Sequence, residues 1–519
     1  MSRAPYAENE QVDAVVVGTG AGGAPLLARL AEAGLSVVAL DAGRAFRPEE
    51  HVADELAADI YWMEERLSGG ADPTAFGSNN SGMGVGGSTL HWGAFCPRPD
   101  PRDLTLKSTT GFGTDWPIPH AELIEYVHRA EYFTGVSGPA RYPWDTERHY
   151  AYPPVARNAS ADAMARGCAA LGITATDAPA ALVSRDREQP HWGQRQACVN
   201  CGTCHQGCRN AAKTSMDTSY LPHAVAHGAE IRAGARVLSV EFDSAGQITA
   251  VVYHQGGETR RQRCRTLFLC AGGVETPRLL LNLGIANSSG QVGRNFMAHV
   301  ATQVWGTFDA EMRMNRGYPS SLITEDLLRP EDADFAGGYL IQSLGVLPVN
   351  LANGLARGAG FWGKRLQNLL RRYNRMAGIG INGDCLPHPD NRLSLSDETD
   401  AFGQRKARID FGYHANERAI DRHARRTMTA IWEAAGARDI FAVDRSAHTI
   451  GTCRMGSNGD EAVVDADGRS FDIPNLLICD NSIFPSALAA NPALTIMALS
   501  LRTADRFLRA DAQEGRHRR

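Results

Sequence analysis

The sequence predicts a mixed α/β (α+β) fold, with one domain built on a largely parallel sheet and a second on an antiparallel sheet. A β-branched run at 12–17 precedes a glycine-rich turn, an amphipathic helix and an apolar run ending at residue 41, which is the order of a β–α–β unit. Segments 392–396 and 407–412 alternate apolar and polar residues, as half-exposed antiparallel strands do. With 519 residues, 43% of them hydrophobic, the chain can hold several domains.

The β–α–β unit carries the pattern of a dinucleotide site. Gly18 allows the tight turn after the first strand, Gly20 lets the backbone approach a pyrophosphate, and Gly23 lets helix and strand pack closely. Asp41, at the end of the second strand, is placed to bind ribose hydroxyls. Taken together these parts predict a bound dinucleotide, without distinguishing NAD from FAD.

A second glycine-rich segment, residues 79–95, includes a Gly-Gly-Ser-Thr-Leu-His run that ends at His91. With the first strand, it resembles the glucose-methanol-choline family of FAD-dependent alcohol oxidoreductases, whose second FAD contact is a Gly-Gly-Ser/Thr-x-x-Asn/His loop. Further matches follow in family order over nearly the full chain, at Val237 after Gly234-Ala-Arg, at 270–281, at 292–299 and from His448 onward. The sequence departs from the family pattern at Gly273, Asp41 and His91, where alanine, glutamate and asparagine are common.

The resemblance implies FAD, bound by a Rossmann-like domain that is assembled from residues 1–110, 225–300 and 448–519. Residues 111–224 and 301–447 would form the substrate-binding domain. The implied cofactor-binding residues are Gly18, Gly20, Gly23, Asp41, Gly86, Gly87, Ser88, His91, Val237, Ala271, Asp480, Pro492 and Thr495. The alternating strands are expected to form one wall of the substrate pocket, whose polar candidates are Tyr339, Gln342, Asn382 and Asp384.

The family's catalytic pair is a histidine before a Gly-Thr-x-x-Met turn and a histidine or asparagine before the last helix, positions held here by His448 and Asn491. Oxidation of an alcohol requires a base for the hydroxyl proton, a group that orients the oxygen and a hydride acceptor, which would be flavin N5. Histidine suits the first role because its pKa is close to neutrality. The predicted donor is a sugar or glycoside hydroxyl. The alternatives are a non-sugar alcohol or sterol, a lyase, and a flavin or iron–sulfur protein without turnover.

Two further features concern the flavin. The last helix is expected to begin beside Asn491 at Pro492, so that its N-terminal N–H groups would stabilise the anionic reduced flavin. His91 occupies the place at which pyranose 2-oxidases and choline oxidases attach FAD covalently. The resemblance leaves two alternatives for His91, which are a covalent bond to FAD and a hydrogen bond to it.

Four cysteines lie within eleven residues, at Cys198, Cys201, Cys204 and Cys208. The run is too compact for two pairs of zinc ligands. Its spacing is that of bacterial ferredoxins, but Arg209 follows the last cysteine instead of proline, and no second run exists. Some sugar dehydrogenases of the family carry an iron–sulfur cluster on a comparable segment, whereas other members have such segments without metal. Both alternatives stay open at this point.

Charge and hydropathy bear on partners. The net charge of −5, with both signs interspersed, argues against a nucleic-acid partner, and no apolar run reaches the length of a transmembrane helix. No signal-peptide pattern precedes residue 12, and 11 cysteines without a paired framework favour a reducing compartment. The protein is therefore expected in the cytoplasm, or exported only with a signal-bearing partner. The electron acceptor could be oxygen, a quinone or a cytochrome, and an iron–sulfur cluster would add a small-subunit or cytochrome partner.

Overall fold

The structure is a computed structural model that describes residues 5–58, 66–74, 81–331 and 333–517. Its strands are β1 (Gln11–Val17), β2 (Val37–Asp41), β3 (Arg66–Gly69), β4 (Thr176–Asp177), β5 (Arg187–Gln189), β6 (Gly193–Arg195), β7 (Glu230–Ala233), β8 (Arg236–Phe242), β9 (Ile248–Gln255), β10 (Glu258–Leu269), β11 (Met297–Val300), β12 (Gln303–Thr307), β13 (Leu322–Thr324), β14 (Tyr339–Leu344), β15 (Met376–Gly383), β16 (Arg392–Thr399), β17 (Arg405–Asp410), β18 (Arg438–Val443), β19 (Ser446–Ile450) and β20 (Leu476–Ile478).

Its α-helices are α1 (Gly23–Glu32), α2 (Leu106–Thr110), α3 (His120–Thr134), α4 (Ala159–Ala170), α5 (Tyr220–Ala226), α6 (Gly272–Leu283), α7 (Pro348–Gly358), α8 (Gly363–Arg371), α9 (Ala415–Ala434) and α10 (Ala493–His517). Short 3-10 helices occur at η1 (Pro48–Glu50), η2 (Gly87–Leu90), η3 (Pro101–Thr105), η4 (Cys204–Gln206), η5 (Met216–Thr218), η6 (Tyr373–Arg375) and η7 (Asn481–Ile483). The mixed α/β class predicted from the sequence is confirmed.

The first sheet has seven strands in the order β7-β2-β1-β10-β9-β8, with β20 beside β10. Strands β1, β2, β7, β10 and β20 run parallel, and β8 and β9 extend the sheet as antiparallel strands. Every residue of β2 is buried, as are the last four of β1, because parallel strands are covered on both faces. The carboxyl ends of β1 and β2, where Gly18 and Asp41 lie, meet at one edge of this sheet.

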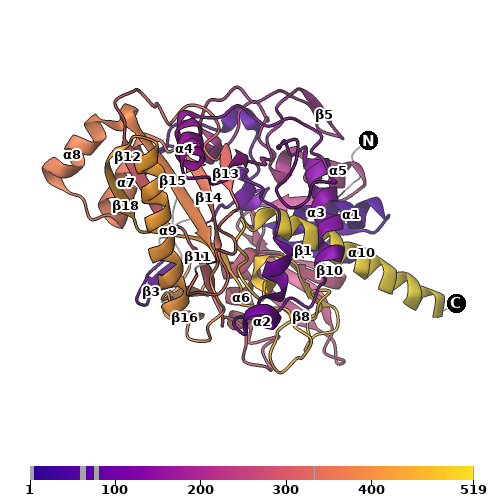
Figure 1. Cartoon of the computed structure of the whole chain (residues 1–519). Helices are drawn as coiled ribbons and strands as arrows, with labels where there is room; N and C mark the ends of the chain where they lie inside the picture. Colours follow the sequence, from indigo (N-terminus) through magenta and orange to yellow (C-terminus); the bar gives the residue numbers. More distant parts are fainter. Residues whose placement is uncertain (1–4, 59–65, 75–80, 332, 518–519) are drawn as a thin grey trace.

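The second sheet has eight strands in the order β18-β12-β15-β14-β13-β4, with β11 and β19 joined to it through β15. Its pairings are antiparallel, and helices α4 and α9 pack on it with the apolar side chains of Met164, Ile420 and Trp432. Figure 1 shows α9 and α4 alongside β14 and β15, with α7 and α8 at the end of the molecule far from both termini.

One expectation about the substrate wall is wrong. Strands β16 and β17 do pair antiparallel, but they join β3 in a separate three-stranded sheet. The antiparallel sheet that faces the large cavity is instead the eight-stranded one, through β12, β14 and β15. Alternation of apolar and polar residues shows that one face of a strand is buried, and it does not show what covers that face.

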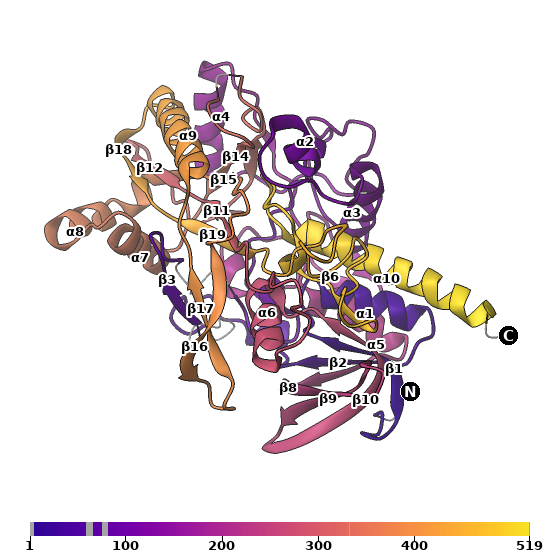
Figure 2. The same cartoon turned by 90° about the horizontal axis from the view of Figure 1, so that it is seen from below.

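Helix α10 begins in the middle of the molecule and ends at its edge beside the C-terminus, and Figure 2 shows it crossing above the seven-stranded sheet next to α1. Its first turn therefore lies between the two large sheets. Over the described ranges, none of the helices is long and apolar enough to cross a membrane. The domain boundary expected at 447/448 falls inside β19. This strand pairs with β11 and also carries His448.

Candidate active site

A cavity of about 420 Å³ lies between the two large sheets. Of the site residues predicted from the sequence, those that line it are Gly18, Gly20, Asp41, Gly87, Ser88, His91, Val237, Ala271, His448, Asp480, Asn491 and Pro492. Gly23, Gly86 and Thr495 lie next to it in the chain without lining it. The four clustered cysteines line a separate, smaller cavity. Folding therefore brings together glycine loops and C-terminal residues that are more than 400 positions apart in the chain.

The first glycine turn closes one end of the cavity. Gly18 has φ +94°, and a Cβ there would lie 2.5 Å from the Cys270 carbonyl oxygen, so only glycine fits. A Cβ on Gly23 would lie 2.0 Å from the Gly18 carbonyl oxygen, so α1 packs against the turn too closely for any side chain there. The Asp41 carboxylate accepts hydrogen bonds from the Thr19 N–H (3.1 Å), the Thr19 hydroxyl (2.6 Å) and the Gly43 N–H (2.9 Å). Burial raises the pKa of Asp41.

The second glycine segment touches the first. A Cβ on Gly87 would lie 2.7 Å from Cα of Gly20, and the Gly86 N–H donates to the Thr19 hydroxyl at 3.0 Å. Ser88 faces the cavity, and its hydroxyl accepts from the Gly82 N–H at 3.1 Å. Bare backbone from two distant segments thus forms one end of the cavity, which is the surface that a pyrophosphate and a flat ring system require.

His91 is buried at the cavity, and its environment is positively charged. Burial, together with the charges of Lys213 and His205, lowers the pKa of His91 to about 3, so its imidazole is neutral. The Nδ1 atom of His205 is 3.1 Å from the His91 carbonyl oxygen. The Lys213 ammonium is fully buried and donates to the carbonyls of Leu90 (2.9 Å), Trp92 (3.1 Å) and Cys204 (2.6 Å). Lys213 therefore ties the cysteine segment to the loop that carries His91.

His448 projects into the cavity from β19 and makes a direct contact with a second histidine. Its Nδ1 lies 2.7 Å from Nδ1 of His299, which is on β11. The Nε2 atom of His299 lies 2.8 Å from the Leu488 carbonyl oxygen and 3.1 Å from that of Ala487. Carbonyl oxygens only accept, so His299 carries its proton on Nε2 and presents an unprotonated Nδ1, because burial lowers its pKa to about 4.

This chain of contacts fixes the tautomer of His448. Since Nδ1 of His299 is an acceptor, Nδ1 of His448 carries the proton, and Nε2 of His448 is left with its lone pair. Burial, His299 and Arg445 lower the pKa of His448 well below its ordinary value, so the ring is neutral. His448 also has φ +65°, a strained conformation for a residue other than glycine and one that concentrates at functional sites.

Asn491 completes the pair. Its Nδ2 lies 3.3 Å from Nε2 of His448, and its Oδ1 accepts from Nδ2 of Asn382 on β15 at 2.8 Å. The amide N–H of Asn491 therefore points at the lone pair of His448, where it can also donate to a substrate oxygen. Pro492 and Ala493 follow at the start of α10, so the N-terminal end of that helix faces the cavity as expected.

Asp480 and Thr495 lie on the other side of the site. The Asp480 carboxylate accepts from the Gly272 N–H (2.8 Å), the Thr276 hydroxyl (2.6 Å) and the Ser482 N–H (2.8 Å), which joins the end of β20 to the start of α6. Burial raises the pKa of Asp480. Thr495 is fully buried in the first turn of α10, and its Oγ1 has no hydrogen-bond partner within the described chain.

The cysteine segment lies directly behind the His91 loop. The four cysteines and Tyr318 line a cavity of about 10 Å³. Sγ of Cys198 accepts from the Asn200 N–H (3.5 Å), and Sγ of Cys208 accepts from the Lys213 N–H (3.3 Å). Cys204 is buried, which raises the pKa of its thiol, whereas Cys201 is exposed. The thiol donor set suits an iron–sulfur cluster, but a cavity of this volume has room for about one water molecule.

The large cavity fits FAD on the evidence of its own residues. Its walls run from the touching glycines 20 and 87, past Asp41 at the β2 end, to His448 and Asn491 at the far end. An acid near the glycine turn and bare backbone beside it suit the ribose and pyrophosphate, and Thr495 offers an unpaired hydroxyl near the start of α10.

The two glycine loops, the parallel sheet and the unprotonated nitrogen of His448 at the cavity are the features of a flavin-dependent oxidoreductase. The chain belongs to the GMC oxidoreductase family: residues 70–301 match the model of its N-terminal part and residues 387–500 match that of its C-terminal part. The members of this family bind FAD and act on CH–OH donors.

Relatives of known activity align over nearly the whole chain. The large subunit of fructose dehydrogenase from Gluconobacter japonicus is 30% identical, covering 98% of this chain and 99% of its own. The 2-methyl-1,2-propanediol dehydrogenase of Mycolicibacterium austroafricanum is 28% identical, covering 96% and 95% respectively. Pyridoxine 4-oxidase from Mesorbium loti has the same fold, with a TM-score of 0.67 at 17% identity, covering 96% of this chain and 99% of its own.

Several site residues were not identified from the sequence. His299 ends the family-like segment 292–299, but its contact with His448 spans 149 positions, and Arg445 gave no signal at all. Of the polar candidates in the sheet, Gln342 and Asn382 line the cavity. Tyr339 and Asp384 do not line it, and the hydroxyl of Tyr339 instead lies 2.7 Å from Nδ1 of His423.

Proposed function

We propose that this protein oxidises a hydroxyl group of a sugar or glycoside to a carbonyl, with Nε2 of His448 as the base. The observation that carries the proposal is the His299–His448–Asn491 arrangement, which leaves one unprotonated nitrogen facing the cavity. An alcohol oxygen between His448 and Asn491 would accept from the amide of Asn491 and donate its proton to His448. Bound FAD supplies the acceptor for the hydride that leaves the carbon.

The preference for a donor with several hydroxyl groups rests on the wall opposite the glycine loops. Three residues with amide side chains, Gln303 of β12, Gln342 of β14 and Asn382 of β15, line the cavity, and amides offer both donors and acceptors. The full-length similarity to a fructose dehydrogenase large subunit supports the same class of donor. A long-chain alcohol or a sterol would instead favour an apolar wall.

The test is the rate of flavin reduction by substrate under anaerobic conditions. His448→Ala should keep its FAD but reduce the flavin roughly 10²–10⁴-fold more slowly, the usual contribution of a positioned base. Unchanged reduction kinetics would remove His448 from this role. If no sugar or other alcohol bleaches the flavin of the unaltered protein, oxidation itself is the wrong assignment, and a lyase or a flavoprotein without turnover replaces it.

We also propose that FAD is bound covalently through His91. The support is that His91 lines the cavity and that its ring is neutral, which is the form in which an imidazole nitrogen can bond to the flavin. Acid-precipitated protein should stay yellow, and His91→Ala should release its flavin on the same treatment. A colourless pellet from the unaltered protein would leave His91 as a hydrogen-bonding neighbour of the flavin.

We also propose a second candidate role, for the cysteine segment. It is favoured by the four cysteines lining one small cavity and by the two backbone N–H groups that donate to the sulfurs of Cys198 and Cys208. A cluster bound there would supply one-electron transfer toward a partner. The present cavity would have to widen to accept it. Iron and sulfide analysis, with electron-spin resonance of anaerobically prepared protein, decides between a cluster-bearing dehydrogenase and an enzyme with a metal-free segment. For a metal-free enzyme, assays with oxygen and quinones would then identify the electron acceptor.

A further inference from the structure

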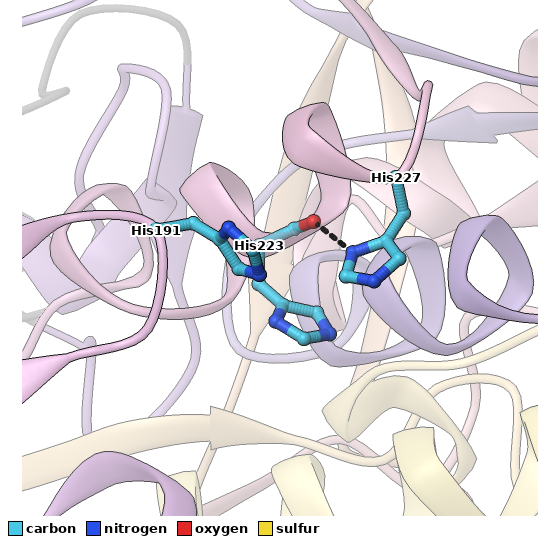
Figure 3. Close-up of side chains that lie close together, drawn as sticks. All are labelled: His191, His223 and His227. Carbon is cyan, nitrogen blue, oxygen red and sulfur yellow. Dashed lines mark hydrogen bonds between the residues drawn. The ribbon is translucent and has the colours of Figure 1, made fainter.

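Three histidines form a cluster away from the large cavity. His191 lies in the turn between β5 and β6, His223 lies in α5, and His227 follows the last residue of α5. Figure 3 shows the three rings gathered at one place, and ligand nitrogens from all of them lie within 4.8 Å of one another. Within the ranges that the structure describes, this is the only group of three or more histidine, cysteine or acidic side chains that converges so closely.

Helical spacing and an unusual backbone conformation bring the three rings together. His223 and His227 are four residues apart, so their side chains leave the helix on the same face, and their ring centroids are 4.3 Å apart. The ring of His191 lies 5.1 Å from that of His223 and 5.3 Å from that of His227. His191 has φ +62°, a strained conformation that glycine or asparagine would adopt more easily.

The hydrogen bonds leave nitrogen lone pairs available. Nδ1 of His227 lies 2.8 Å from the His223 carbonyl oxygen, so it carries a proton and leaves Nε2 unprotonated. Histidines that bind metals have this arrangement, with one nitrogen donating to a carbonyl and the other on the metal. Nδ1 of His223 is buried without a hydrogen-bond partner in the described chain. The Glu32 carboxylate, on α1, lies 4.0 Å from Nε2 of His223 and adds negative charge beside the cluster.

We propose that His191, His223 and His227 bind a divalent transition-metal ion of the Zn²⁺ class. Three imidazoles suit such an ion, and Glu32 or water would fill the fourth position of a tetrahedron. Ligand nitrogens around tetrahedral zinc are roughly 3.4 Å apart, as follows from a bond length of about 2.05 Å. His191 and His227 are exposed, so rotation of their side chains can bring the ligand nitrogens to this spacing without disturbing the core.

The ion would join two parts of the chain with different roles. Strand β6, which follows His191, leads directly into the cysteine segment, whereas α5 leads into β7 of the seven-stranded sheet. A bound ion would therefore fasten the β5–β6 hairpin to the FAD-binding sheet. None of the three histidines lines the large cavity, so binding of the ion is separate from the oxidation proposed above.

The test uses the flavin-loaded protein after treatment with a chelator, with Zn²⁺ as the probe in calorimetric titration. One ion should bind per chain, and the melting temperature should rise by a few degrees. His191→Ala and His227→Ala should each weaken binding by at least roughly tenfold and abolish the rise. His149→Ala removes another exposed histidine, whose Nδ1 lies 2.9 Å from the Ala140 carbonyl oxygen, and should leave binding unchanged.

Because thiols also bind zinc, the position of the ion must be seen directly. Anomalous scattering at the zinc edge from crystals soaked with Zn²⁺ should show the ion between the three imidazoles. Absence of binding, binding that survives the loss of His191 and His227 together, or an ion found only at the cysteine segment would each overturn the proposal. Flavin reduction by substrate should be the same in these variants as in the unaltered protein, so failure here and failure of the proposed function are distinguishable.

Discussion

Replacing His299 tests whether the tautomer of His448 is set by its neighbour. In His299→Ala the Nδ1–H of His448 loses its acceptor at 2.7 Å inside a buried site. A buried donor left without a partner costs about 1–3 kcal/mol. The ring can escape this cost by moving its proton to Nε2, which removes the lone pair that faces the substrate. At 1.36 kcal/mol per factor of ten, the reactive form should become about 5- to 150-fold rarer.

The assay is the anaerobic rate of flavin reduction, measured together with FAD content. His299→Ala should lower the rate by that factor while FAD stays bound. His299→Asn, whose Oδ1 can accept near the place of the lost nitrogen, should recover part of the rate. His423→Ala is the matched control, because His423 is also buried and bonded, at 2.7 Å to the Tyr339 hydroxyl, and it does not line the cavity. The reasoning fails if the two alanine variants are equally fast.

Three further predictions concern charges around the site. Arg445→Met removes a charge that lowers the pKa of His448, so that pKa should rise and the acid limb of kcat/KM should move to higher pH in a pH profile. Lys213→Met leaves three buried carbonyls without their donor and should lower both the melting temperature and FAD retention, whereas the exposed Lys107→Met should change neither. Asp41→Asn turns one of two accepting oxygens into a donor and should weaken FAD binding roughly tenfold, as measured by flavin release.

The first β–α–β unit could be predicted from the sequence because its signals are local. The run at 12–17 became β1 (Gln11–Val17), the helix begins at Gly23, and Asp41 ends β2. Each of these features depends on neighbours within a few positions, through β-branching, glycine at positive φ and helical spacing. The predicted catalytic pair also came together, since Asn491 lies 3.3 Å from His448 across only 43 positions.

The remaining parts of the site depend on contacts across the chain, which single-sequence patterns do not encode. Asn382 reaches Asn491 across 109 positions, and Lys213 reaches the Leu90 carbonyl across 123. The alternation at 392–396 correctly indicated an antiparallel pair, but the choice between facing the cavity and joining β3 is made by tertiary packing. A lysine in a polar stretch gave no sign that its ammonium would be buried, since lysine is almost always exposed.

With His448 in the proposed role of base, its neutral partner His299 would allow a ring with a lowered pKa to accept a proton. When the hydroxyl proton reached Nε2 of His448, positive charge would spread to its Nδ1–H and strengthen the hydrogen bond to His299. His299 in turn donates to the Leu488 and Ala487 carbonyls, whose dipoles stabilise that charge without a carboxylate. A carboxylate in place of His299 would raise the pKa of His448 and keep it protonated in the free enzyme. Carbonyl dipoles would instead favour the charged ring only while the proton is in transfer, and Arg445, whose charge lowers the pKa of His448, would favour its release.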